Sequence, residues 1–169
     1  MKMESVISDF TNNGRVFKHL LNSTNSAEVL YRPAPGKWNL LEIACHLLDE
    51  ERLDFRARMK NIMDNPDKEM EPIDPQGWVT SHNYSEKDFA AVLKDFIVER
   101  ENSVQWLANL TNEDLEKKLE HKNFGTVTVR HFMLNWLAHD YLHIRQIVAL
   151  KYSFLKNNTG ADLRYAGDW

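Results

Sequence analysis

The sequence predicts an all-α protein, a four-helix bundle with a long crossover loop between its second and third helices. Three observations lead to this prediction. Four long segments carry apolar residues at helical spacing, only one stretch has the composition of a strand, and the connection 64–84 is long and rich in proline. Amphipathic helices of this kind bury their apolar faces against one another. The 169 residues fit a single domain, 1–169.

The first two helices are predicted at residues 3–23 and 39–63. Apolar residues recur at helical spacing in the first, namely Val6, Phe10, Phe17 and Leu21. The stretch YRPAPGKW then contains two prolines and a glycine, which cannot continue a helix. Asn39 and Glu42, three residues apart, are typical of an N-cap and its capping-box partner, so the second helix is expected to begin there.

The third helix is predicted to open at Ser85, with Asp88 as its capping partner, and the fourth to run from Thr128 to about Tyr152. Between them, LTNEDLEKKL predicts a short helix capped by Thr111, and NFGTVTV predicts a loop or turn. Within that loop TVTV is the one strand-like stretch, and it is too short to pair alone. The C-terminal segment is expected to be loop and extended chain.

Composition excludes several classes of function. The net charge is −4, and lysine and arginine are spread along the chain rather than gathered in a stripe, so nucleic acid is not expected as a partner. No run approaches the roughly 20 apolar residues of a membrane span. The N-terminus lacks the features of a signal peptide, and a single cysteine, Cys45, allows no internal disulfide. We therefore expect a cytoplasmic protein without a membrane partner.

Two histidines stand four residues apart in WLAHDYLHIRQI, within the predicted fourth helix. Residues i and i+4 share a helix face, so His139 and His143 point the same way, into the bundle. One helix supplies two ligands to a metal at this spacing, as in HExxH, although the glutamate of that motif is missing here. Catalytic sites of this kind use three protein ligands, and His46 is the third candidate. A buried polar pair and a pH-sensitive pair are the alternatives.

Charged and aromatic residues could complete such a site. Glu50 lies one helical turn after His46 and is the candidate general base or acceptor for its ring; a solvated helix edge is the alternative. Arg100 lies on the apolar face of the third helix and needs a partner, because an unpaired buried charge is costly. It would either bind a substrate carboxylate or, as we favour, pair with Glu50 or Asp49. Trp78, on the long loop, is a candidate pocket wall and substrate contact.

The segments that carry the histidines resemble motifs of a known family. RPAPGKWNLLEIACHLLDEE (32–51) resembles the second-helix motif of the DinB-like superfamily, which includes metal-dependent hydrolases of the YfiT type. GTVTVRHFMLNWLAHDYLHIRQI (125–147) resembles its fourth-helix motif, and YAGDW (165–169) resembles its C-terminal end. The resemblance implies a four-helix bundle with a divalent metal site. The ligands that it implies are His46, His139 and His143.

The resemblance implies an enzyme but leaves its reaction open. Members of the superfamily include hydrolases and S-transferases that use low-molecular-weight thiols of the bacillithiol type, so a small-molecule substrate is expected, with or without such a thiol. Zinc or nickel is the expected metal, with iron and manganese as alternatives. The family also suggests a homodimer. The alternative function is a non-catalytic helical bundle that binds metal or dimerises, because fold and site do not fix the chemistry.

Overall fold

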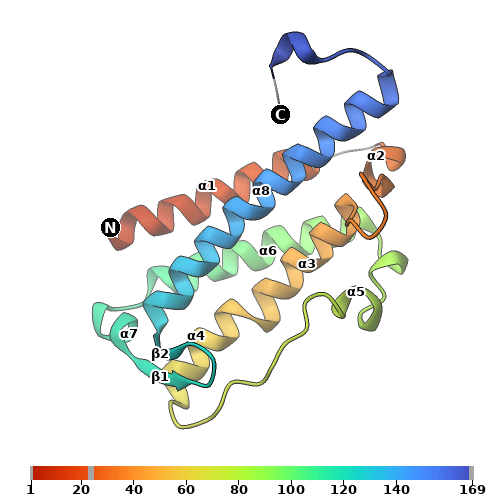
Figure 1. The fold of residues 1–169 in the computed structure, drawn as a ribbon. Helices are drawn as coiled ribbons and strands as arrows, with labels where there is room; N and C mark the ends of the chain where they lie inside the picture. The colour runs from red at the N-terminus through yellow and green to blue at the C-terminus, as the bar shows by residue number, and fades with distance from the viewer. Residues whose placement is uncertain (1, 23–24, 168–169) are drawn as a thin grey trace.

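Four long helical segments run side by side in the computed structural model, which describes residues 2–22 and 25–167 (Figure 1). In chain order the elements are α1 (Met3–Leu21), α2 (Ser26–Leu30), α3 (Leu40–Leu53), α4 (Phe55–Asp64), α5 (Trp78–Ser81), the 3-10 turn η1 (Tyr84–Glu86), α6 (Phe89–Ala108), α7 (Asn112–Glu116), β1 (Lys118–His121), β2 (Gly125–Thr128), α8 (Val129–Thr159) and the 3-10 turn η2 (Arg164–Ala166). The bundle consists of α1, the pair α3–α4, α6 and α8. The predicted four-helix bundle is confirmed.

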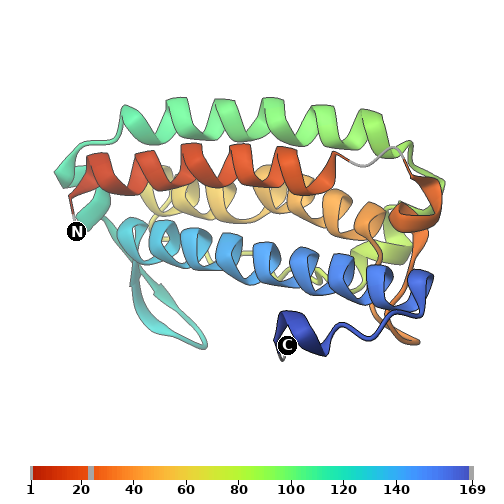
Figure 2. The same cartoon turned by 90° about the horizontal axis from the view of Figure 1, so that it is seen from above.

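The order of the helices in the bundle differs from their order in the chain. Helix α6 packs against both α1 and α3, and α8 packs against both α1 and α4, an arrangement that Figure 2 shows from above. Helices α1 and α8 run in one direction, whereas α3–α4 and α6 run in the other (Figure 1). The segment 65–77 returns along the bundle from the end of α4 towards the start of α6. The predicted crossover is therefore present, and it makes these two neighbouring segments parallel.

Capping side chains set where the long helices begin. The Asn39 side chain accepts from the Glu42 N–H at 2.9 Å and Glu42 accepts from the Asn39 N–H at 3.0 Å, so the predicted capping box at the start of α3 is confirmed. Thr128 accepts from the His131 N–H at 3.1 Å at the start of α8, also as predicted. Gly160 ends α8 with a φ of 62°, a left-handed conformation that glycine adopts without steric cost.

Two predicted helices have different boundaries. The second is divided at Asp54, whose φ and ψ of −114° and −97° lie outside the helical region, into α3 and α4. An unbroken apolar stripe gave no sign of this division. The third helix does not begin at Ser85, which lies in the 3-10 turn η1. It begins at Phe89, because the side chain of Asp88 accepts an N–H of the first turn at 2.7 Å and acts as the N-cap itself.

Two helix ends also differ. Helix α1 ends at Leu21, and residue 23, the predicted end, lies outside the described residues. Helix α8 continues past the predicted Tyr152 to Thr159 and has 31 residues. Despite that length, neither α8 nor any other helix of the described chain is apolar enough over a long enough stretch to cross a membrane.

The prediction that residues 126–129 form a loop without a strand partner was wrong. Strands β1 and β2 form an antiparallel hairpin in which Leu119 lies opposite Val127. Both side chains are buried in the core at that end of the bundle. The predicted short helix ends at Glu116, which frees the following residues to pair. The hairpin is stabilised by packing against the bundle, since an isolated two-stranded hairpin is marginal in water.

The bundle core consists of two apolar clusters with a buried polar layer between them. Representative members are Phe17, Phe96 and Ile147 in one cluster, and Phe10, Leu107 and Trp136 in the other. Between them lie Asn13 on α1, Glu51 on α3, Arg100 and Ser103 on α6, and Asp140 on α8, all of them buried. Each of these helices thus carries apolar residues on both sides of a polar one, so the layer marks the middle of the bundle.

Arg100 is the centre of the polar layer. Its Nη1 and Nη2 donate to the two carboxylate oxygens of Asp140 at 2.6 and 2.7 Å, and its Nε donates to Glu51 at 2.7 Å. Asn13 donates to Asp140 at 3.2 Å, and Ser103 donates to Glu51 at 2.6 Å. The acceptors of both acids are therefore occupied by donors from neighbouring helices, as buried charges require.

The prediction of an internal ion pair for Arg100 is confirmed, but its predicted partners were wrong. They are Glu51 and Asp140 rather than Glu50 or Asp49. Consecutive helical residues differ by about 100° in direction. Glu51 therefore faces α6, whereas Glu50 faces the same side as His46, towards α8.

Replacement of Arg100 with methionine is expected to lower the free energy of unfolding by about 3–5 kcal/mol, because two carboxylates stay buried without their counter-charge. Burial raises the pKa of Glu51, and Arg100 opposes that rise. Without Arg100, folded Glu51 holds a proton at a pH where the unfolded chain has released it, so stability falls as pH rises. Urea denaturation should therefore show a larger loss at pH 8 than at pH 5. Arg52→Met, at the surface of α3, is the control; an equal effect in both variants would contradict the prediction.

Candidate metal centre

Three histidines meet where α3 and α8 face each other. His139 Nε2 lies 3.2 Å from His46 Nε2 and 3.0 Å from His143 Nε2. The candidate ligand atoms of the three rings all lie within 4.8 Å of one another. Two nitrogens bound to one tetrahedral zinc ion at its usual distance are roughly 3.3 Å apart. The ring nitrogens therefore have the spacing of ligands to a single ion.

Protonation also suits these rings to a metal. Burial is the main cause that lowers the pKa of His46 to about 2, of His139 to about 3 and of His143 to about 4. All three imidazoles are thus neutral near pH 7, the form that binds a metal. The neighbouring histidines add to the effect on His46, since two positive charges so close together would repel each other.

The hydrogen bonding of the three rings also fits a metal site. The Nδ1 atoms of His46 and His143 are buried and have no hydrogen-bond partner within the described chain, which is unusual for a buried polar atom. Hydrogen bonds between the Nε2 atoms would use some of their lone pairs and leave these Nδ1 atoms as unpaired acceptors. An ion held by all three Nε2 lone pairs would instead place an N–H on every Nδ1. The donor set therefore fits a divalent metal.

Glu50 provides the nearest acceptor for such an N–H. Its Oε1 lies 3.7 Å from His46 Nδ1, and both side chains are almost fully buried. Burial, together with the nearby carboxyl group of Asp54, raises the pKa of Glu50 to about 9. The structure thus brings Glu50 beside His46, one helical turn along α3, as the spacing in the sequence predicted. A negative charge from a carboxylate at this position would strengthen an imidazole as a metal ligand.

A cavity of about 510 Å³ opens beside the three rings. The Trp38 ring lies 4.8 Å from that of His46, between centroids, and stacks nearly parallel to that of His143 at 6.5 Å. The ring centroids of Phe55 and His139 are 5.3 Å apart. Neither aromatic wall was predicted from the sequence. The one available signal was the position of Trp38 directly before the helix cap, in a segment that must turn back over the start of α3.

Local contacts hold the Trp38 segment in place. Arg32 donates to both carboxylate oxygens of Glu42, at 2.5 and 2.7 Å, and to the Lys37 carbonyl at 2.9 Å. Bidentate pairs of this kind fix geometry as well as add energy. Since Glu42 also belongs to the capping box, the start of α3 and the cavity wall share one anchor.

Trp78 and Arg100, the two predicted substrate contacts, do not line this cavity. Trp78 is 9% exposed, belongs to the apolar core and stacks on His82 at 5.6 Å between centroids. Every nitrogen of the Arg100 guanidinium has a carboxylate partner inside the bundle. Their assignment to substrate binding therefore has no support from their positions. Pro75 and Gln76, from the same loop as Trp78, do line the cavity.

Asp49 anchors the other end of that loop. Tyr84 Oη donates to Asp49 Oδ2 at 2.7 Å, and His82 Nδ1 lies 2.7 Å from the same oxygen. Asp49 is thus turned away from the three histidines even though it directly precedes Glu50. The two neighbouring acids therefore have different contacts: Asp49 holds the loop, and Glu50 contacts the candidate ligand His46.

Comparisons with known proteins concern the family and the fold. A family model described as the DinB superfamily matches residues 9–147. The structure of YfiT from Bacillus subtilis, described as a probable metal-dependent hydrolase with an unusual four-helix bundle topology, aligns with a TM-score of 0.79 and 15% sequence identity. The alignment covers 95% of this chain and 89% of that one. A search of curated proteins finds no match. At this identity, the structural likeness concerns the fold.

Replacement of Glu50 with alanine is expected to weaken zinc binding about 10- to 100-fold, because the Nδ1–H of His46 loses its nearest acceptor. Competition with a chromophoric chelator measures the affinity. Asp49→Ala is the matched control, because Asp49 lies on the same turn and contacts His82 and Tyr84 of the loop instead of a candidate metal ligand. It should change zinc affinity by less than about twofold. A similar loss of affinity in both variants would argue against a specific role for Glu50.

Proposed function

The chain belongs to the DinB superfamily, and from this premise we propose that it is a metal-dependent hydrolase of small molecules. One observation carries the proposal: the neutral Nε2 atoms of His46, His139 and His143 converge, with contacts of 3.0 and 3.2 Å, beside an open cavity. Three protein ligands are typical of catalytic rather than structural zinc sites, which close their coordination with four.

Zinc or nickel is the proposed ion, because imidazole nitrogen suits both. When bound, a divalent ion supplies Lewis acidity, which polarises a substrate carbonyl or phosphoryl oxygen and makes water more acidic. The three histidines carry no charge of their own, so they leave the full charge of the ion available for this purpose.

Glu50 is the proposed proton acceptor. It lines the cavity and contacts His46, so the His46 ring alone separates its carboxyl group from the candidate ion site. Its Oε1 can orient His46 through Nδ1–H. Burial raises the pKa of Glu50 to about 9, but the positive charge of an ion bound to His46 would lower that pKa, so that the other oxygen of the carboxylate could accept a proton from an attacking water. Asp54 lies beside Glu50 and lines the same cavity, so a proton can be held between the two carboxyl groups.

The remaining walls of the cavity are suited to bind an uncharged part of the substrate. Trp38 and Phe55 cover two of the histidine rings and limit the access of water to them. The amide of Gln146, one turn beyond His143, can donate to a substrate oxygen. S-transfer from a low-molecular-weight thiol, the second reaction that the family suggests, would use the same histidines. A requirement for added thiol distinguishes S-transfer from hydrolysis.

The protein, purified without an affinity tag or chelator, is expected to contain close to one divalent ion per chain by mass spectrometry. The His46, His139, His143 triple-alanine variant should lose the ion and keep its helical circular dichroism. Absence of metal after incubation with zinc, nickel and manganese would contradict the proposal. Loss of helical signal together with the metal would instead indicate a structural ion.

Glu50→Gln should retain the ion and lower kcat by about 10²- to 10⁴-fold on whichever ester, amide or phosphate ester the wild type hydrolyses. Hydrolysis in water alone supports the proposal. Turnover that requires an added thiol and forms a thioether would replace the hydrolase assignment with S-transfer. Asp49→Gln is the control for folding and loop anchoring, and its kcat should change far less.

A further inference from the structure

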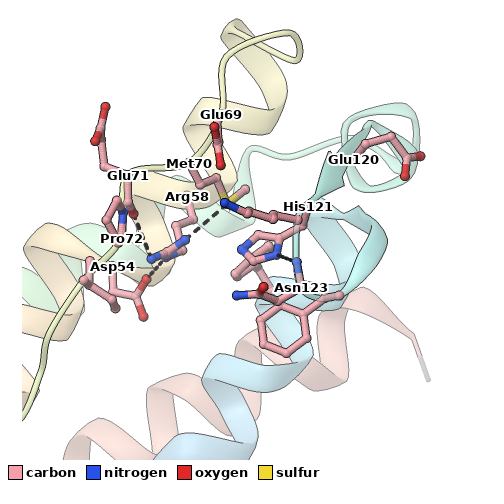
Figure 3. Close-up of a pocket in the computed structure, with 13 residues that line it drawn as sticks. Asp54, Arg58, Glu69, Met70, Glu71, Pro72, Glu120, His121 and Asn123 are labelled. Carbon is pink, nitrogen blue, oxygen red and sulfur yellow. Dashed lines mark hydrogen bonds and ion pairs between the residues drawn. The ribbon is translucent and has the colours of Figure 1, made fainter.

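A second hollow, of about 560 Å³, adjoins the histidine cavity and has no role in the proposed reaction. It is a groove between the β1–β2 hairpin, the segment 69–73 and the outer faces of α4 and α8 (Figure 3). Asp54 lines both this groove and the histidine cavity. The groove therefore begins where the cavity ends.

A ladder of side chains at i,i+4 spacing connects the two hollows. His46, Glu50, Asp54 and Arg58 follow one another along α3 and α4, and each contacts the next. Glu50 lies 3.7 Å from His46, the Glu50 and Asp54 carboxyl groups interact, and Asp54 forms an ion pair with Arg58. The step from His46 to Arg58 is on the order of 18 Å along a straight helix. A molecule that reaches both hollows must therefore be extended.

The guanidinium of Arg58 lacks strong acceptors on the side that faces the groove. Its Nε donates to Asp54. Within the described residues, the one acceptor of its Nη1 is the Met70 thioether, at 3.3 Å, and that of its Nη2 is the Glu71 carbonyl, also at 3.3 Å. Thioether sulfur is a weak acceptor, and the contact to the Glu71 carbonyl is longer than an ordinary N–H···O hydrogen bond. In contrast to Arg100, Arg58 thus keeps two terminal nitrogens available to an anion.

The hairpin turn carries further N–H donors, which lie across the groove from Arg58. His121 Nδ1 accepts from the Asn123 N–H at 3.1 Å, so the neutral ring carries its proton on Nε2. Figure 3 shows the His121 ring and the Asn123 side chain facing the Arg58 guanidinium, whereas the carboxylates of Glu71 and Glu120 point away from the centre of the groove. N–H donors of Arg58, His121 and Asn123 thus face the centre of the groove. The carboxylate of Asp54 is already paired with Arg58, and Glu69 and Lys122 add one charge of each sign to the lining.

Apolar surfaces surround these donors. Phe132 lies beneath Arg58, with its ring centroid 6.0 Å from the guanidinium carbon. Phe124 lies against the His121 ring at 4.8 Å between centroids and is 70% exposed, which is unusual for a phenylalanine. Met70 also lines the groove. The groove therefore offers apolar contact around a fork of N–H donors.

We propose that this groove binds the end of the substrate remote from the reacting bond, and that this end is an apolar group bearing an anion, either a carboxylate or a phosphate. The inference rests on the proposed function, because it assigns the reacting end of the same molecule to the histidine cavity. Arg58 receives two anion oxygens on its terminal nitrogens, a geometry that suits guanidinium. Phe124 covers the apolar part.

Binding to the groove can be measured without knowing the substrate. The probes are 4-phenylbutyrate, phenyl phosphate and the uncharged 4-phenylbutyramide, titrated into ¹⁵N-labelled protein and followed by NMR. At least one anion should shift the Asn123 amide and bind about tenfold or more tightly than the amide, since a charge-assisted hydrogen bond contributes about 1.5–3 kcal/mol. The ratio of the two anions identifies carboxylate or phosphate. Equal binding of anion and amide would overturn the proposal.

Variants locate the site of binding. Arg58→Met should weaken anion binding about tenfold, whereas Arg52→Met, an arginine of α3 that pairs with Glu99 outside the groove, should leave it unchanged. If Arg58→Met fails to fold, Phe124→Ser decides, because that side chain is exposed and its removal spares the core. Phe124→Ser should weaken binding several-fold. An unchanged affinity in Phe124→Ser, or in folded Arg58→Met, would overturn the proposal.

The same titration on a His139→Ala variant separates this inference from the proposed function. The anion should bind this variant as it binds the wild type, because the groove does not include His139. Wild-type protein that binds the anion but no metal would refute the hydrolase and leave an anion-binding groove. A protein that binds metal but no anion would refute the groove alone.

Discussion

The ion pair of Arg100 with Glu51 and Asp140 is the interaction on which the rest of the structure depends. Amphipathic helices with apolar stripes can rotate or slide past one another at small cost, because one apolar contact replaces another. A buried guanidinium cannot be exchanged in this way. It requires its carboxylates on α3 and α8 at one rotation and one height, so it fixes both helices relative to α6. A buried pair of this kind adds little net stability, and its role here is to specify the arrangement.

The position of the candidate metal centre follows from that constraint. Asp140 lies between His139 and His143 on α8, and its direction into the bundle turns both histidines towards the adjacent cavity. On α3, Glu51 faces Arg100, and the preceding residue, Glu50, therefore faces His46 and α8. The nearby positive charge of Arg100 also contributes to the low pKa of His139. One buried ion pair thus sets both the directions of the candidate ligands and part of their protonation.

The ion pair also accounts for a glycine inside a helix. A Cβ on Gly14 of α1 would lie 3.0 Å from Cγ of Arg100, closer than most real contacts. Glycine costs about 1 kcal/mol in a helix relative to alanine, and the space that it leaves admits the stem of Arg100. The aromatic rings of Phe10, Phe17 and Trp136 then enclose the guanidinium at 5.4–5.8 Å from their centroids. The charge is thus shielded from water by groups that themselves attract cations.

Sequence periodicity predicted the features that depend on one helix at a time. The four long helices, the capping box at Asn39 and the shared face of His139 and His143 are local properties, and all are present. The hairpin and the break at Asp54 depend on packing between elements. The spacing of apolar residues within one helix carries no information about that packing. Glu50 was predicted in place of its neighbour Glu51 as a partner of Arg100, because an apolar stripe is wider than the 100° between neighbouring residues. The other partner, Asp140 on a different helix, was not predicted.

The walls of the site were harder to predict than its centre for the same reason. Histidines at fixed spacing on known helices indicate a shared ligand set, whereas Trp38 reaches the site from a loop and Phe55 from the helix that follows a break. These walls, rather than the three histidines, must distinguish one reaction from another, because a single ligand set serves hydrolysis and thiol transfer alike. The ladder from His46 to Arg58 extends that distinction beyond the cavity. It joins His46, a candidate metal ligand, to Arg58, whose terminal nitrogens have weak acceptors, so one i,i+4 stripe connects the candidate metal centre to the proposed anion groove.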